Sequence, residues 1–89
     1  MKGIVTVLGK DSVGIIAKIC SYMSDKNVNV LDIAQTIVDG YFNMMMVVDL
    51  NASTEPLASM ASELETLGRD IGVVVRFQHE DIFSAMHRI

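Results

Sequence analysis

The amino-acid sequence predicts an α+β sandwich, in which two helices cover one face of a four-stranded antiparallel sheet. Two observations support this fold class. Four apolar runs with strand character and two amphipathic helical stretches follow one another in the order strand, helix, strand, strand, helix, strand. Asp39-Gly40 stands between the two middle strands, where this dipeptide strongly favours a tight hairpin.

The first half of the chain supplies a strand, a helix and a second strand. Residues 4–8 are apolar or β-branched and lie between glycines, which indicates a strand. Residues 13–26 repeat their apolar side chains at helical spacing, and Asn27 is suited to a left-handed stop. Residues 28–38 alternate as a strand does, but the phase changes at Val30-Leu31, so we expect a bulge or bend there.

The second half supplies the hairpin partner, a second helix and a last strand. Residues 41–50 form the third strand and residues 71–78 the fourth. Between them, Ser53 or Thr54 is expected to cap a helix that has Pro56 in its first turn and ends at Gly68. Because right-handed crossovers carry the helices, this order gives the ferredoxin-like βαββαβ arrangement.

The predicted sheet is apolar on both faces. In residues 41–50 one face is apolar throughout, yet Met45 and Val47 fall on the other face, where a sheet covered on one side should be polar. We therefore expect the second face to be covered by another subunit, in a homodimer or higher homo-oligomer, and by a short C-terminal helix. The chain then forms one domain, 1–89, with its core at 3–78 and a helical tail at 80–89. The tail spaces its apolar residues as a helix does: Ile82, Phe83, Met86 and Ile89.

Composition limits the possible partners and compartments. The chain has 89 residues, of which 51% are hydrophobic and 20% charged, so some apolar surface should need a partner. The net charge of −4 disfavours nucleic acid, whose phosphates need a basic face. Residues 1–30 carry four lysines against two aspartates, a net charge of +2 that suits a small anionic or zwitterionic ligand. No apolar run resembles a signal segment or a membrane span, and the single Cys20 fits a reducing compartment, so we expect a soluble cytoplasmic protein.

The turn at residues 9–14 joins the first strand to the first helix and is the first candidate site. Amides at a helix start lack intrahelical partners and attract anionic groups. The same turn also fits a structural role, in which Gly9 and Gly14 let the chain turn and Asp11 or Ser12 caps the helix. Its spacing matches neither a dinucleotide fingerprint nor a phosphate loop, so the residues alone leave both alternatives open.

Catalytic and metal chemistry find little support in the sequence. His79 and His87 are separated by about 12 Å if they lie on a helix, which is too far for one metal ion. Cys20 stands among apolar helix positions, where a reactive thiolate is not favoured. Ser12 has no histidine close in sequence. We therefore expect no catalytic residues, metal or cofactor.

Three segments of the chain resemble the ACT domain, a regulatory module that is attached to enzymes of amino-acid metabolism and also occurs alone. Residues 5–16 (VTVLGKDSVGII) are close to the family's first strand and its Asp-x-Pro-Gly-Ile turn, with Val13 where Pro is usual. Residues 27–33 (NVNVLDI) are similar to the segment that opens strand two, and residues 41–48 (YFNMMMVV) to strand three. The chain looks most like the small uncharacterised bacterial and archaeal proteins with a single ACT domain, and it is similar to the ACT repeats of the glycine-cleavage transcriptional repressor.

The resemblance implies a regulatory protein that binds a small effector, an amino acid in the family, and conveys its level to an enzyme or transcription factor. In the family the effector binds where the first turn meets strand two, commonly across a side-by-side dimer that extends the sheet. The alternative is a dimerising adaptor that binds no metabolite. Carried over residue by residue, the resemblance and the turn give these candidate ligand-binding residues: Lys10, Asp11, Ser12, Gly14, Ile15, Asn29 and Asp32.

Overall fold

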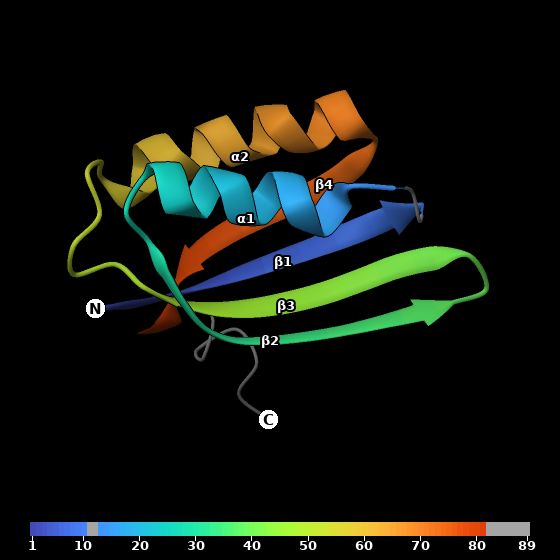
Figure 1. Ribbon diagram of the computed structural model, residues 1–89, viewed down its shortest axis with the longest axis horizontal. Coiled ribbons are helices and arrows are strands. Elements are labelled where there is room, and N and C mark those ends of the chain that lie inside the picture. The colour runs from blue at the N-terminus through green and yellow to red at the C-terminus, as the bar shows by residue number, and fades with distance from the viewer. Residues whose placement is uncertain (11–12, 82–89) are drawn as a thin grey trace.

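The computed structural model describes residues 1–10 and 13–81. The strands form one antiparallel sheet in the order β2-β3-β1-β4, and both helices lie over one face, here called the helix face (Figure 1). The opposite side is the open face. The predicted fold class is therefore confirmed. The elements are β1 (Lys2–Lys10), α1 (Ile15–Asp25), β2 (Asn29–Val38), β3 (Tyr41–Asp49), α2 (Leu57–Ile71) and β4 (Val73–His79).

The core lies between the two helices and the helix face of the sheet. β3 is paired on both sides, and its alternate side chains from Phe42 to Val48 are buried. Removing these apolar side chains from water is the main favourable term in folding. The helices contribute five buried side chains of their own: Ile15, Ile19, Met23, Met60 and Leu64.

Two turns adopt the backbone conformation that the sequence predicts. Asp39 and Gly40 have φ values of 52° and 81°, and two successive positive φ angles are the mark of a type I′ hairpin. After α1, Asn27 has a φ of 58°, in the left-handed region that asparagine tolerates better than most residues. The Asn27 Nδ2 atom also donates a hydrogen bond of 2.9 Å to the Ala52 carbonyl, which ties this turn to the loop before α2.

The prediction that the second helix ends at Gly68 is wrong. α2 continues to Ile71 and ends at Gly72, which has a φ of 83°. Gly68 is buried within the helix, because α2 approaches β4 closely at this point. A Cβ atom there would lie 2.7 Å from a Val75 methyl and 2.8 Å from the Val73 carbonyl oxygen. The glycine therefore allows close packing and does not end the helix.

Two other boundaries differ from the prediction. Pro56 takes the N-cap position of α2, with a φ of −65°, in place of Ser53 or Thr54. β1 also continues past Gly9, which the sequence suggests as the end of the strand. Gly9 is needed for contact with β4, since a Cβ atom there would lie 2.9 Å from the Val73 Cα atom.

The predicted bulge in β2 is confirmed. The register with β3 steps from Val30 directly to Asp32, which leaves Leu31 as the extra residue. Because of this extra residue, Val30, Ile33 and Ile37 all stand opposite buried β3 residues and share the helix face. The bulge thus reconciles the two apolar phases of the strand.

Candidate small-molecule site

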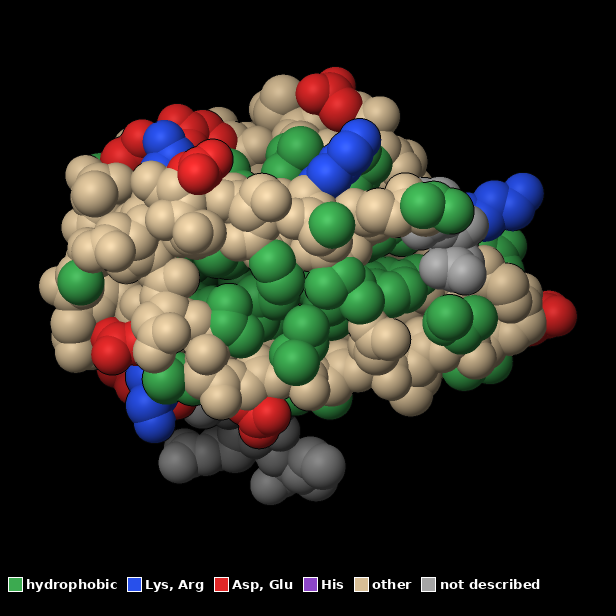
Figure 2. All heavy atoms as spheres, viewed as in Figure 1, with side chains coloured by type: hydrophobic (Ala, Val, Ile, Leu, Met, Phe, Trp, Pro, Cys, Tyr) green, Lys and Arg blue, Asp and Glu red, His purple; other side chains and the backbone are tan. Residues whose placement is uncertain are grey.

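A groove runs between α1 and β2 on the helix face. Figure 2 shows it as an apolar furrow across the middle of the molecule. On its β2 side, Ile33 and Ile37 remain 41% and 56% exposed, although both side chains face the helices. On its α1 side lie the half-buried Ile16 and Cys20. Because β2 is an edge strand, the core is open along this side, and we call the opening the α1–β2 groove.

The first end of the groove lies beside the start of α1. Gly14 takes the N-cap position with a φ of 89°, so this place is filled by neither Asp11 nor Ser12. The first helical hydrogen bond is donated by the Lys18 amide to the Gly14 carbonyl, so the amides of residues 15–17 precede it. A cavity of about 300 Å³ opens here, lined by Gly14, Ile15, Ile16, Ala17, Gln35, Ile37 and Phe42.

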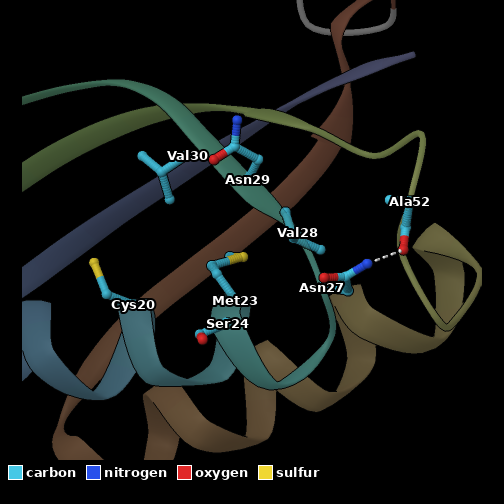
Figure 3. A pocket seen from close by; sticks show the side chains of 8 residues that line it. All are labelled: Cys20, Met23, Ser24, Asn27, Val28, Asn29, Val30 and Ala52. Carbon is cyan, nitrogen blue, oxygen red and sulfur yellow. Dashed lines mark hydrogen bonds between the residues drawn. The ribbon is translucent and has the colours of Figure 1, made fainter.

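The second end of the groove lies where α1 finishes and β2 begins (Figure 3). In this view the Cys20 sulfur points from α1 toward β2, whereas the Asn29 amide is turned away from α1. The Asn27 side chain closes one side through its hydrogen bond to Ala52. A cavity of about 370 Å³ opens here, lined by Cys20, Met23, Ser24, Asn27, Val28, Asn29, Val30 and Ala52.

Within one chain, the predicted ligand-binding residues fall into two separate groups. Gly14 and Ile15 line the first cavity, and Asn29 lines the second. Asp32 lies further along β2, opposite Val47 on the open face, and its Oδ1 accepts a hydrogen bond from the Ile33 amide. A single copy therefore does not bring the two groups together.

The remaining predicted residues belong to the first turn. Lys10 is exposed at the end of β1, opposite Tyr41. Asp11 and Ser12 lie outside the described residues. Val13, which follows them, has a fully exposed side chain at 103% of its reference area. The turn thus starts from a charged residue and presents an apolar one to solvent just before the helix.

Among the described residues, those that line the two cavities include no charged side chain. A charged cluster instead joins the end of α1 to α2. Lys26 Nζ lies 2.5 Å from Glu55 Oε1 and 3.6 Å from Glu63 Oε1, and the Tyr22 hydroxyl donates a hydrogen bond to Glu63. This hydrogen bond lowers the pKa of Glu63, while the bond to Glu55 raises the pKa of Lys26. Burial, followed by the contact with Glu63, raises the pKa of Tyr22.

Two residues of the groove escape prediction from sequence. Helical spacing places Cys20 in the core, but its side chain is half-buried and lines the second cavity. Gln35 lines the first cavity. The available signal was the break that Gln35 makes between Ile33 and Ile37, on a strand face that is otherwise apolar.

A family model described as the ACT domain matches residues 3–78. The chain belongs to the ACT domain family. A UPF0237 protein from Bifidobacterium longum is 59% identical over 88 residues, which cover 99% of this chain and 98% of that protein. A solved structure of an ACT domain protein from Streptococcus pneumoniae is 37% identical in sequence. The match covers 98% of this chain and 98% of that chain, with a TM-score of 0.83. A structure described as a glycine cleavage system transcriptional repressor is 18% identical over 89% of this chain and 47% of that chain; its TM-score of 0.73 supports a shared fold.

ACT domains are regulatory domains that bind small molecules, so the family points to regulation and not to catalysis. In residues 1–10 and 13–81 of this ACT domain, no three His, Cys, Asp or Glu side chains come close enough to hold a metal ion. None of the helices in the same part of the chain has the length and apolar character to cross a membrane.

Proposed function

We propose that this ACT domain is a non-catalytic cytoplasmic regulator that binds a small molecule of the amino-acid class between two copies of the chain. Binding is communicated to a regulated enzyme or transcription factor. One observation carries the proposal: the α1–β2 groove leaves apolar side chains exposed beside an unpaired sheet edge.

The edge of β2 is suited to a second copy of the chain. Among the described strands, β2 pairs with β3 alone, so along the described part of the chain its other side offers backbone amides and carbonyls for strand pairing. Ile33 and Ile37 stand beside this free edge with much of their surface in water. A second β2 strand would pair the backbone groups and cover the two isoleucines at once, which is how strand addition gains affinity.

A two-fold arrangement would also unite the two groups of predicted residues. Two β2 strands paired antiparallel about an axis near their middle would bring the start of one strand beside the end of the other. β2 begins with Asn29. Near its other end, next to the hairpin, lies Ile37, which lines the cavity at Gly14. Asn29 of one copy would then lie near Gly14 of the other.

The chemistry of the united groups matches an amino acid. The amides of residues 15–17 point their partial positive charge out of the helix start, where a carboxylate binds favourably. The described first turn of α1 has no acidic side chain to oppose that charge. The Asn29 amide can both donate and accept hydrogen bonds. Asp32 is exposed on the open face of the same edge strand, so it would meet an ammonium group only if the ligand reached across the strand.

A dimerising adaptor without a metabolite is the second candidate. Two observations favour it: Val13 replaces the proline that presets the turn in the family, and the described lining of the groove is apolar and uncharged. In this case the groove would serve association alone, and a regulated protein would recognise the assembled pair.

A thermal shift screen against the twenty amino acids distinguishes the two candidates. A ligand at one hundred times its Kd stabilises the folded state by about 2.7 kcal/mol. For a domain of this size that raises Tm by roughly 10 °C or more. The regulator requires a shift with at least one amino acid, and the shift should be lost in Asp11→Ala and Asn29→Ala. Asn43→Ala, an exposed asparagine on the open face, is the matched control and should keep it.

The dimer is tested separately by sedimentation of Ile33→Lys. A charge beside the β2 edge should prevent strand pairing and give a monomer without unfolding the core. If the wild type is dimeric and no amino acid shifts its Tm, the adaptor is supported. A wild type that is monomeric at every concentration, with and without ligand, contradicts both candidates.

A further inference from the structure

The α1–β2 groove is lined by apolar side chains where it begins, at the start of α1. Its described walls come mainly from α1 and β2, whereas the predicted tail helix lies outside the described residues from residue 82 on. Of the seven described residues that line the first cavity, Gln35 alone has a polar side chain. The half-buried Ile16 stands on the α1 side, and the exposed Ile37 stands on the β2 side. An apolar group between these two side chains would be removed from water together with their exposed surface, which is favourable.

The charged side chains of α1 belong to another side of the helix. Lys18 and Asp25 line a different cavity, of about 330 Å³, together with Leu67 of α2. They therefore lie on the side of α1 that faces α2. A charged ligand group in the α1–β2 groove would lose its hydration without meeting an opposite charge in the described lining. The groove thus disfavours acidic and basic side chains of a ligand.

The two cavities of the groove have the size of a small ligand. Their volumes are about 300 and 370 Å³, at the lower end of the range of about 300–1,000 Å³ that small-molecule pockets cover. On the α1 wall, Ile16 lines the first cavity and Cys20 the second. Residues four positions apart lie about 6 Å apart along a helix axis, and a free cysteine behaves as a small hydrophobe. The apolar wall therefore continues from the first cavity toward the second.

The proposed ligand has its carboxylate at the first end of this groove. Gly14 and Ile15, at the start of α1, line the same cavity as Ile37. The Gln35 side chain belongs to the same lining, and its amide oxygen can accept a hydrogen bond from an ammonium group. A ligand held here by its backbone groups has the apolar part of the groove beside its side chain.

On the basis of the proposed function, we propose that the α1–β2 groove receives the side chain of the effector and selects amino acids whose side chain is apolar and larger than a methyl group. Each methylene group buried in the groove tightens binding roughly fourfold. Leucine should therefore bind roughly fiftyfold more tightly than alanine, because it adds three carbons. Asparagine has nearly the shape of leucine, but its amide would be buried against apolar side chains, so it should bind about 10- to 100-fold less tightly than leucine.

Ranking the twenty amino acids by thermal shift on the whole chain, followed by calorimetric titration, tests this selectivity. We expect an apolar amino acid larger than alanine to give the largest shift, and the Kd values of leucine, alanine and asparagine to differ as stated. A polar or charged amino acid, glycine or alanine at the head of the ranking overturns the selectivity and leaves the proposed regulator standing. No shift with any of the twenty contradicts both.

Two matched variants test where the side chain of the ligand lies. Ile37→Asn replaces an apolar wall of the groove with a hydrogen-bonding one, so the preference for leucine over asparagine should fall by about tenfold or more. Val38→Asn makes the same change at the next residue, which is 65% exposed and stands opposite Tyr41 on the open face, and should leave the preference unchanged.

The ratio of the two Kd values is the measurement that decides, because a general loss of affinity would lower both. Circular dichroism and sedimentation check that each variant is folded and assembled as the wild type is. A preference for leucine that is equal in the wild type and in Ile37→Asn, or that falls as much in Val38→Asn, overturns the placement of the side chain in the groove.

Discussion

The two edge strands of the sheet, β4 and β2, differ in how completely the helices cover them. On β4 the side chains that face the helices, Val73, Val75 and Phe77, are all buried, because α2 packs directly onto the strand at Gly68. On β2 the corresponding Ile33 and Ile37 remain exposed, because α1 stands apart from the strand and leaves the groove.

This difference separates stability from recognition. The β4 side completes the core within one chain, so changes there should reduce the free energy of unfolding. The β2 side exposes apolar surface and backbone groups that a partner can use, so changes there should affect association more than folding. Four predictions test this division, in order of decreasing effect.

The largest effect is expected from truncating the core at β4. Phe77→Ala should lower the free energy of unfolding by about 3–5 kcal/mol, because it leaves a cavity under α2. Ile37→Ala, on the matching face of β2, should cost less than about 1 kcal/mol in a dilute sample, since the side chain is already largely hydrated. Urea titrations of both variants give the comparison. Similar costs would mean that the two edges are equally important for folding.

A close second should come from Gly68→Ala. The new methyl group would meet the Val73 carbonyl, which is part of the backbone and cannot turn aside, so we expect a loss of about 1–3 kcal/mol. This loss outweighs the gain that alanine normally brings to a helix. Ser62→Ala, on the exposed side of α2, is the control and should be neutral or slightly stabilising. A stabilised Gly68→Ala would contradict the close approach of α2 to β4.

A smaller effect is expected at the turn that starts β2. Asn27→Ala should cost about 1–2 kcal/mol, because alanine is strained at a φ of 58° and the hydrogen bond to Ala52 is lost. Asn27→Gly loses the same hydrogen bond but accepts the backbone conformation, so it should recover part of the stability. Chemical denaturation of the two variants separates the two causes. Equal losses would assign the whole effect to the hydrogen bond.

The smallest effect is expected from the charged cluster between the helices. The pKa of Glu63 is lowered in the folded state, so its contribution is present above the ordinary value of 4.5 and is lost as pH falls through the folded value. The pKa values of Tyr22 and Lys26 are raised, so their contributions are present below 10.0 and 10.5 and are lost as pH rises through the folded values. Glu63→Gln should therefore flatten the fall of stability in acid. If the acid part of the stability-versus-pH curve is unchanged, Glu63 contributes nothing to stability there.

Most of the fold could be predicted from local patterns. The order of elements, the hairpin at Asp39-Gly40 and the bulge after Val30 all follow from apolar periodicity and from the conformations that Gly and Asp allow. Gly68 could not be interpreted correctly, because glycine marks both a helix end and a close contact. The choice depends on how near α2 comes to β4, which only tertiary structure decides.

Less of the candidate site could be predicted from the sequence. Gly14 and Asn29 follow from family resemblance, but their separation at opposite ends of α1 depends on the path of the chain. Cys20 and Gln35 could not be assigned to the groove, because periodicity identifies the face of an element and not whether a neighbour covers it. A sequence shows that β2 is apolar; it does not show that α1 leaves it uncovered.

The bulge at Leu31 also bears on aggregation through the exposed edge of β2. An apolar strand with a free edge invites the addition of further chains, and repeated addition leads to fibrils. The extra residue interrupts the edge and increases its local twist, so a regular ladder on β2 is confined to residues 32–38. In the proposed dimer, this interruption would favour pairing with one neighbour over the repeated addition of strands.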